Sequence, residues 1–268
     1  MTHDKLNGSI HVPTQQLFNL HGKIAIVTGA TGGIGLPVTV ALAEAGASIV
    51  SIQVPRDINA DALRIAVEAT GQTFRYFECN LMDASSIKTC FTEIWDAGIV
   101  PDILFHAAGI THKSTVVETS VGTLDRVIDL NIKAAYLVCQ AFGERLITLG
   151  RPGKVINIAS MAADLVQEGV NVYSSSKAFV RSMTRGMSNE WARYGIQVNS
   201  VSPGWIATGM CRDMSQDADF HQYVVDRTSS GRWGQPEDLR GVVIFLASAA
   251  SDFITGADIL VDGGVLFR

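Results

Sequence analysis

The chain has 268 residues, is 47% hydrophobic and 18% charged, and carries a formal net charge of -5. This length and composition can bury a full core, exclude extensive disorder, and fit one large domain better than two small ones. The lack of a basic excess excludes a nucleic-acid backbone as the main partner and leaves small molecules as the default.

Apolar, β-branched runs alternate with amphipathic segments from residue 23 onward. Strands are predicted at 24–28, 48–53, 73–78, 102–107, 154–160, 196–202 and 257–262. Helices are predicted at about 34–45, 58–70, 84–97, 120–148, 173–194 and 236–248. This alternation predicts an α/β fold, a doubly wound parallel sheet of about seven strands flanked by helices.

The two stretches without a clear element are residues 1–20 and about 203–235. The first is predicted to be an N-terminal extension to a single domain at 21–268. The second is far longer than an ordinary connection, and such loops usually act as lids or binding segments, so it is the predicted substrate lid.

Cysteine usage and hydropathy predict a cytoplasmic protein. The four cysteines are dispersed, without a CxxC pair or a His and Cys cluster at metal-ligand spacing, so reduced thiols and no metal site are expected. No apolar run approaches the roughly 20 residues of a membrane span, and the N-terminus has no signal pattern, so no membrane partner is expected.

A glycine-rich stretch, TGATGGIG at 28–35, follows the first predicted strand and opens into a helix. Gly29 permits a sharp turn, Gly33 lets the backbone approach a pyrophosphate, and Gly35 allows close packing of helix on sheet. The alternative is a turn without a ligand. The strand-loop-helix setting favours dinucleotide binding on a Rossmann-type sheet.

Tyr173 and Lys177 lie four residues apart, so a helix places both on one face, where a cation makes a phenol easier to deprotonate. This spacing also arises by chance. Ser160 ends a predicted strand thirteen residues earlier and can reach the same sheet edge, although an isolated serine more often simply ends a strand. Asn131 lies in a predicted helix, although asparagine is a poor helix former. An asparagine in such a place often has a polar role, but one that is simply solvated is equally common.

Five motifs, in this order, resemble the short-chain dehydrogenase/reductase family over about residues 22–268: the glycine stretch, LNIK, Ser160 with YSSSK, Pro203 with Gly204, and VDGG at 261–264. Residues 231–264 look most similar to its sugar and polyol dehydrogenases, including those for 2-deoxy-gluconate. The resemblance implies that an NAD(P)-dependent oxidoreductase transfers a hydride between nicotinamide and a secondary alcohol or ketone.

The resemblance also implies roles for individual residues. Tyr173 is implied as the catalytic acid/base, with Lys177 lowering its pKa and holding the nicotinamide ribose. Ser160 is implied to polarise the substrate oxygen and Asn131 to anchor a water in the proton path. The implied cofactor contacts are Gly29, Thr31, Gly33, Ile34, Gly35, Gln53, Arg56, Asn80, Leu81, Ala107, Ala108, Gly109, Tyr173, Lys177, Pro203, Gly204, Ile206 and Thr208.

Two other function classes are compatible with this fold. Nucleotide-dependent epimerases or dehydratases tend to be longer, with a larger substrate domain. Non-catalytic NAD(P)-sensing regulators usually lose the tyrosine or the lysine, and both are present in this chain.

The chain departs from the family pattern at three places. His106 and Ala107 replace the two asparagines of the common NNAG motif, and His106 is predicted to be a hydrogen-bonded core residue or else to touch the cofactor region. Asn80, followed by Leu81, replaces an acid that contacts adenine, so only a neutral contact is implied. Gln53 replaces the acid that binds ribose hydroxyls and repels a 2′-phosphate.

The cofactor prediction follows from the last departure. Repulsion of a phosphate is absent at Gln53, and Arg56 is a nearby cation that could pair with it, although an exposed arginine is as easily solvated. Thr31 offers no positive charge. NADP(H) is therefore slightly favoured over NAD(H).

A homotetramer is expected, partly from the resemblance. The predicted helix at 173–194 has an apolar stripe of Val180, Met183, Met187 and Trp191, and Phe179 and Ala192 widen it. The helices at 120–148 and 173–194 would form one interface and the C-terminal segment another. The alternative is that one chain covers all of this apolar surface.

Overall fold

A computed structural model of the chain describes residues 12–211 and 216–268. Seven parallel strands form one sheet in the order β3-β2-β1-β4-β5-β6-β7, which confirms the predicted doubly wound α/β fold. The strands are β1 Ile24–Thr28, β2 Ser48–Gln53, β3 Phe74–Glu78, β4 Ile103–His106, β5 Gly153–Ile158, β6 Ile196–Pro203 and β7 Asp258–Val261.

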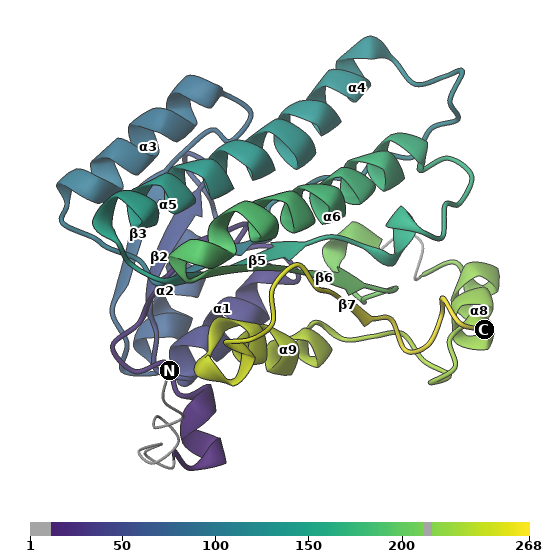
Figure 1. Cartoon of the computed structure of the whole chain (residues 1–268). Helices are drawn as coiled ribbons and strands as arrows, with labels where there is room; N and C mark the ends of the chain where they lie inside the picture. The colour runs from purple at the N-terminus through teal and green to yellow at the C-terminus, as the bar shows by residue number, and fades with distance from the viewer. Residues whose placement is uncertain (1–11, 212–215) are drawn as a thin grey trace, which may run out of the picture.

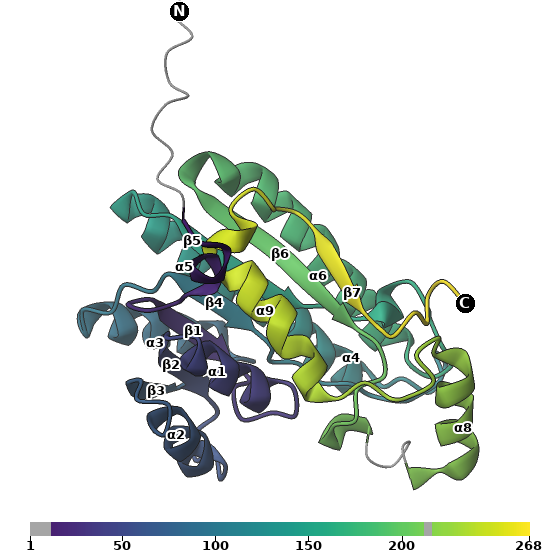
Figure 2. The ribbon, with the colours of Figure 1, turned by 90° about the horizontal axis from the view of Figure 1, so that it is seen from below.

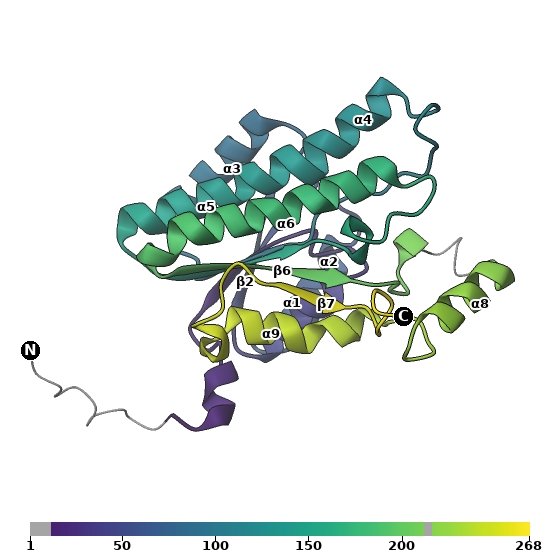
Figure 3. The same ribbon diagram turned by 45° about the vertical axis from the view of Figure 1, so that its right-hand side comes forward.

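Helices cover both faces of the sheet, so the molecule has three layers (Figure 3). Helices α3 to α6 lie on one face (Figure 1), and α1, α2 and α9 lie on the other, as the view from below shows (Figure 2). The helices are α1 Gly35–Glu44, α2 Ala60–Glu68, α3 Ala84–Asp96, α4 Val121–Val127, α5 Ala135–Leu149, α6 Asn171–Trp191, α8 Ala218–Arg227 and α9 Arg240–Ala247.

The two faces of the sheet hold separate apolar cores. Along β4, Leu104 points into the core beneath α3, α5 and α6, while Ile103 and Phe105 point into the core above α1 and α9. Because both faces are covered, the central strands are apolar without alternation, which is why they read as continuous apolar runs in the sequence.

The predicted helix at 120–148 is three segments in the structure. A π-helical stretch, Ile128–Ala134, separates α4 from α5. Such wide turns are rare and are frequent at functional sites. Asn131 lies in this stretch, and its amide bonds to the backbone of Ile110 give a physical reason for the wider turn.

The segment that precedes α9 holds a helix that hydrophobic periodicity did not reveal. Helix α8 lies within the predicted lid and stands beyond the carboxyl ends of β6 and β7 (Figure 1). Asp217 caps it by accepting a hydrogen bond from Phe220 N at 2.9 Å. Residues 212–215 of the predicted lid lie outside the described residues.

The described part of the N-terminal extension packs against the domain. A single 3-10 turn, Thr14–Phe18, places the ring of Phe18 6.4 Å from that of Phe245 in α9. Leu20 is fully buried, and its N–H donates to Ala45 O at 2.9 Å. Among the helices of the described residues, none combines the length and the apolar character needed to cross a bilayer.

Candidate active site

The candidate site is a cavity of about 250 Å³ at the carboxyl ends of the strands. It lies at the boundary between the neighbouring strands β1 and β4. From β1 the chain continues toward one edge of the sheet, and from β4 it continues toward the other. Doubly wound folds bind ligands at this boundary. The walls come from the glycine stretch, the ends of β4, β5 and β6, and the start of α6. They are Gly29, Gly32, Gly33, Ile34, Gly35, Ala107, Ala108, Gly109, Ile158, Ala159, Ser160, Tyr173, Lys177, Pro203, Gly204, Ile206, Thr208, Gly209, Met210 and Cys211.

Gly29, Gly33 and Gly35 of the glycine stretch have no room for a side chain. Gly29 has a positive φ of 67°, and a Cβ there would lie 2.8 Å from Ala108 N. A Cβ on Gly35 would overlap Gly29 O, and one on Gly33 would come within 2.6 Å of Thr208 Cβ. The backbone is therefore open to close approach by a phosphate at the start of α1, as a dinucleotide requires.

Tyr173 and Lys177 enter the cavity from the first two turns of α6. Lys177 is buried and its Nζ donates to Ile158 O at 2.8 Å, while lying 5.7 Å from the centroid of the Tyr173 ring. Ser160 follows β5, and its Oγ accepts a hydrogen bond from Ala162 N at 3.1 Å, which starts the 3-10 turn Met161–Ala163. The structure thus brings Ser160, Tyr173 and Lys177 together at one cavity.

Burial sets the protonation of the tyrosine and the lysine. It lowers the pKa of Lys177 to about 8, because the ammonium loses hydration. It also raises the pKa of Tyr173 above its ordinary value, and a hydrogen bond with Ser160 opposes this rise. The sequence led us to expect a lowered pKa for Tyr173, and in the free protein desolvation raises this pKa instead.

Asn131 lies behind the cavity rather than in its wall. Its Nδ2 donates to Ile110 O at 2.8 Å and to Ser176 Oγ at 3.0 Å, and its Oδ1 accepts from Ile110 N at 2.9 Å. Both amide donors are therefore used within the protein. The side chain fixes the loop after β4 to α6 beside Lys177, since Ser176 precedes that lysine.

His106 is a buried residue at the end of β4, as expected for a core histidine. Its Nδ1 lies 2.8 Å from Thr28 Oγ1, which also accepts from Ala108 N at 3.3 Å. Burial, together with the charge of Lys177, lowers the pKa of His106 to about 3. The imidazole is neutral at working pH and links β1 to β4 directly below the glycine stretch.

The adenosine end of a dinucleotide would lie over the end of β2. The buried Gln53 has an Nε2 atom without a hydrogen-bond partner among the described residues, which suits a bound ribose oxygen. Arg56 has a φ of 61°, the left-handed region that few non-glycine residues adopt, and its N–H donates to Glu78 Oε1 at 3.2 Å. Thr31 Oγ1 donates to Asp57 Oδ2 at 2.6 Å, which ties this turn to the glycine stretch.

Two other predicted cofactor contacts, Asn80 and Leu81, follow the carboxyl end of β3, the strand next to β2. Leu81 is buried in the core between the sheet and α3. Asn80 is exposed and its Oδ1 accepts from Met82 N at 3.1 Å, so its amide closes a turn. Neither lies in the wall of the cavity, and the same holds for Thr31, Gln53 and Arg56 at the adenosine end.

Sequence reasoning placed Met210 and Cys211 only within the predicted lid, and it did not single out Asp57. Met210 and Cys211 follow the end of β6 without strand or helix periodicity, and their side chains become part of the cavity only when this segment folds over the sheet edge. Asp57 follows Gln53, the last residue of β2, by four positions, so its carboxylate was visible in the sequence at this strand end.

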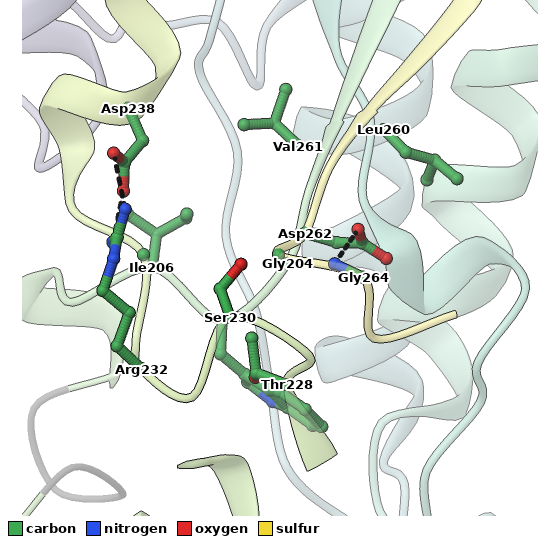
Figure 4. Close-up of a pocket in the computed structure, with 13 residues that line it drawn as sticks. Gly204, Ile206, Thr228, Ser230, Arg232, Asp238, Leu260, Val261, Asp262 and Gly264 are labelled. Atoms are coloured by element: carbon green, nitrogen blue, oxygen red, sulfur yellow. Dashed lines mark hydrogen bonds and ion pairs between the residues drawn. The ribbon is translucent and has the colours of Figure 1, made fainter. Parts of the chain in front are cut away.

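A second cavity of about 430 Å³ lies beside the first and shares Gly204 and Ile206 with it. In Figure 4 the side chain of Arg232 faces Asp238, at 2.7 and 3.0 Å, and Ser230 points into the cavity. None of the four predicted catalytic residues lines it. The Arg232 charge is already paired, and the cavity lies beside the segment that follows β6.

The chain is similar to known proteins over nearly its whole length. The family profile described as enoyl-(acyl carrier protein) reductase matches residues 29–266. The chain is 39% identical over 254 residues to the 2-dehydro-3-deoxy-D-gluconate 5-dehydrogenase of Dickeya dadantii, over 94% of this chain and 98% of that protein. It is 36% identical to the gluconate 5-dehydrogenase of Gluconobacter oxydans, over 93% of this chain and 96% of that protein.

Solved structures of similar proteins also cover nearly the whole chain. The gluconate 5-dehydrogenase from Burkholderia cenocepacia in complex with NADP and tartrate is 34% identical with a TM-score of 0.89, over 94% of this chain and 98% of that chain. A short-chain type dehydrogenase/reductase from Mycobacterium marinum is 32% identical with a TM-score of 0.88, over 95% of this chain and 99% of that chain.

Proposed function

Because the chain belongs to the short-chain dehydrogenase/reductase family, we propose that it interconverts a secondary alcohol and a ketone on a sugar acid with a nicotinamide dinucleotide. The observation that carries this proposal is the meeting of Ser160, Tyr173 and Lys177 at a cavity whose other wall is the glycine stretch. The sugar-acid substrate is supported by the names of several relatives, which act on gluconate or its keto and deoxy derivatives.

The chemistry of the three residues fits this reaction. A bound nicotinamide would supply or accept the hydride. Reduction builds negative charge on the carbonyl oxygen, which Ser160 would stabilise by a hydrogen bond while Tyr173 donates the proton from Oη. Lys177, charged below about pH 8, would favour the resulting phenolate, and its donors beyond the bond to Ile158 O would hold the ribose.

A substrate panel tests this function directly. Gluconate, 5-keto-D-gluconate and 2-dehydro-3-deoxy-D-gluconate are assayed with both dinucleotides at the nicotinamide absorbance, alongside neutral sugars and polyols of the same length as controls. Turnover of at least one sugar acid, with the neutral analogues slower, is expected. Turnover of the neutral compounds alone would contradict the sugar-acid substrate and leave the oxidoreductase chemistry standing.

We further propose a modest preference for NADP(H). Two features support it: Gln53 presents an amide where an acid would repel a 2′-phosphate, and Arg56 makes no ion pair with any described residue. The left-handed turn at Arg56 is held by Glu78 and by the Thr31–Asp57 bond, so this arginine sits on a fixed turn beside the ribose end.

Gln53→Asp should shift the preference toward NAD(H), by about tenfold or more in the ratio of kcat/KM values, because a carboxylate would face the phosphate. Gln53→Asn, which adds no charge, is the matched control and should keep the wild-type ratio within about threefold. Arg56→Ala should weaken the binding of NADP(H) and leave the binding of NAD(H) unchanged. A strong wild-type preference for NAD(H) that Arg56→Ala leaves unchanged would show that Arg56 does not read the phosphate.

We propose that the protein is a homotetramer. Two grooves support an interface on α5: one of about 480 Å³ against α3, and one of about 470 Å³ against α6. Tyr136 is 45% exposed on this helix. At the β7 end of the sheet, Phe253 and Phe267 are exposed in the C-terminal segment proposed for the other interface.

The apolar stripe on α6 is mostly covered within the chain. Val180, Met183, Met187 and Trp191 are all buried within the chain, so the sheet and α5 cover them. Met183, Met187 and Trp191 still line the groove between α5 and α6, and Ala192 at the end of the helix is exposed. The exposed side chains of α5 and of the C-terminal segment add to the support for an oligomer.

Light scattering at micromolar concentration measures the assembly. A mass near four times 28.7 kDa is expected, because the grooves beside α5 would be filled by a second copy. A mass of 28.7 kDa would reject the oligomer. A cytoplasmic location also stays a proposal, supported by the four cysteines being free thiols.

A further inference from the structure

Arg181 is a half-buried cation on α6 that the proposed chemistry does not use. It follows Lys177 by one helical turn and Tyr173 by two, and so lies on the same face of the helix. Its side chain is 18% exposed and contacts two carboxylates. Nη1 donates to Asp164 Oδ2 at 2.5 Å, and Nε lies 3.0 Å from Asp258 Oδ2.

The Asp258 contact fixes Arg181 to the sheet. Asp258 begins β7 and its side chain is 7% exposed. Ser200 and Ser202 on the neighbouring strand β6 donate to its carboxylate at 2.6 to 2.9 Å. With both serines holding it in place, this carboxylate gives the guanidinium one anchored partner and leaves Nη1 directed at Asp164.

The Asp164 contact reaches the segment that carries Ser160. Ser160 Oγ accepts from Ala162 N at 3.1 Å, and Asp164 N donates to Met161 O at 3.0 Å. Residues 160–164 therefore form one compact turn that local hydrogen bonds hold together. One end meets Tyr173 through Ser160, and the other meets Arg181 through Asp164, both on the same face of α6.

We propose that Arg181 is a positioning residue that clamps the turn 160–164 onto α6 and so holds the Ser160 hydroxyl in hydrogen-bond reach of the atom that Tyr173 protonates. This inference rests on the proposed function, in which Ser160 and Tyr173 act on one substrate oxygen. Without the clamp that oxygen loses an aligned donor, and a misplacement of about 1 Å can cost on the order of a hundredfold in rate.

Asp164 offers the cleanest way to release the clamp, because its side chain is 49% exposed and its loss leaves the Arg181–Asp258 pair intact. Asp164→Ala should lower kcat by about ten- to a hundredfold. The dissociation constant of the dinucleotide should stay within about twofold, since the glycine stretch is not touched. Arg185→Gln, an exposed arginine on the same helix, is the control and should retain wild-type kcat.

A double-mutant cycle with Ser160→Ala separates positioning from a general structural role. If the clamp acts through Ser160, Asp164→Ala should cost much less than tenfold once the hydroxyl is gone. An equal loss in both backgrounds would overturn the proposal, and so would a wild-type kcat for Asp164→Ala. Arg181→Lys should recover part of the activity lost in Arg181→Gln, because an ammonium can still pair with one carboxylate.

The proposed function and the clamp fail separately. An active Tyr173→Phe variant would reject the acid/base role and leave no basis for the clamp. An inactive Tyr173→Phe together with a fully active Asp164→Ala would reject the clamp alone. A lower melting temperature for Arg181→Gln, with wild-type kcat for Asp164→Ala, would show that Arg181 only ties β7 to α6.

Discussion

Tyr173→Phe should abolish turnover while leaving dinucleotide binding nearly unchanged. The phenyl ring keeps the packing of the tyrosine on α6, but it has no proton to give or take at the reacting oxygen. General acid/base catalysis contributes about 10² to 10⁴ in rate, so kcat should fall by at least about a hundredfold. Steady-state kinetics and the quenching of protein fluorescence by dinucleotide measure the two effects.

Tyr136→Phe is the matched control, because it removes a hydroxyl from an exposed tyrosine on α5 without touching the cavity. It should leave kcat at the wild-type value. If Tyr173→Phe kept most of the activity, the proton would have to come from another group, and the role proposed for Tyr173 would be wrong.

Lys177→Ala should weaken dinucleotide binding and turnover together, since one side chain is proposed to serve both. The substitution removes the donor to the ribose and the charge that favours the phenolate. A loss of about tenfold or more is expected in both the dissociation constant and kcat. A fall in kcat with unchanged binding would show that the lysine does not contact the ribose.

The same lysine predicts a pH dependence. Burial lowers the pKa of Lys177 to about 8, so its amine is charged below that pH and neutral above it. A neutral amine is a weaker donor, and dinucleotide affinity in the wild type should therefore fall as the pH rises through about 8. Lys177→Ala should show no such step. Titrations between pH 6 and 9 measure both.

Most of the fold follows from local patterns, because both faces of the sheet are covered. A strand such as Ile24–Thr28 is buried on each side, and its apolar run is unmistakable in the sequence. Helix α8 was missed because it has a single fully buried residue, Val224, and its other side chains are polar or only partly covered. Periodicity finds helices through their buried faces, and this one is narrow.

The π-helical stretch at Asn131 also could not be read from sequence. Its cause is a pair of hydrogen bonds to Ile110, a residue 21 positions earlier in the chain. Helix propensity indicated only that an asparagine is unfavourable there. A contact between distant segments decided the conformation.

The meeting of Ser160, Tyr173 and Lys177 at one cavity was predictable, because one strand end and two positions on one helix determine it. The environment of Tyr173 was not, since its raised pKa depends on how the segment with Cys211 covers the cavity. Likewise, Arg181, Asp164 and Asp258 are far apart in sequence, and only the packing of α6 between two other elements brings their charges together.

The sheet order has a consequence for folding. After β3 the chain returns, and β4 pairs with the side of β1 that faces away from β2. This β1–β4 pairing joins residues 78 positions apart, such as Thr28 and His106. Pairing over such a separation costs loop entropy and tends to be slow. The ligand cavity spans the β1–β4 pairing, from Gly29 after β1 to Ala108 after β4. A dinucleotide at a hundred times its dissociation constant would therefore stabilise the joined halves by about 2.7 kcal/mol against unfolding.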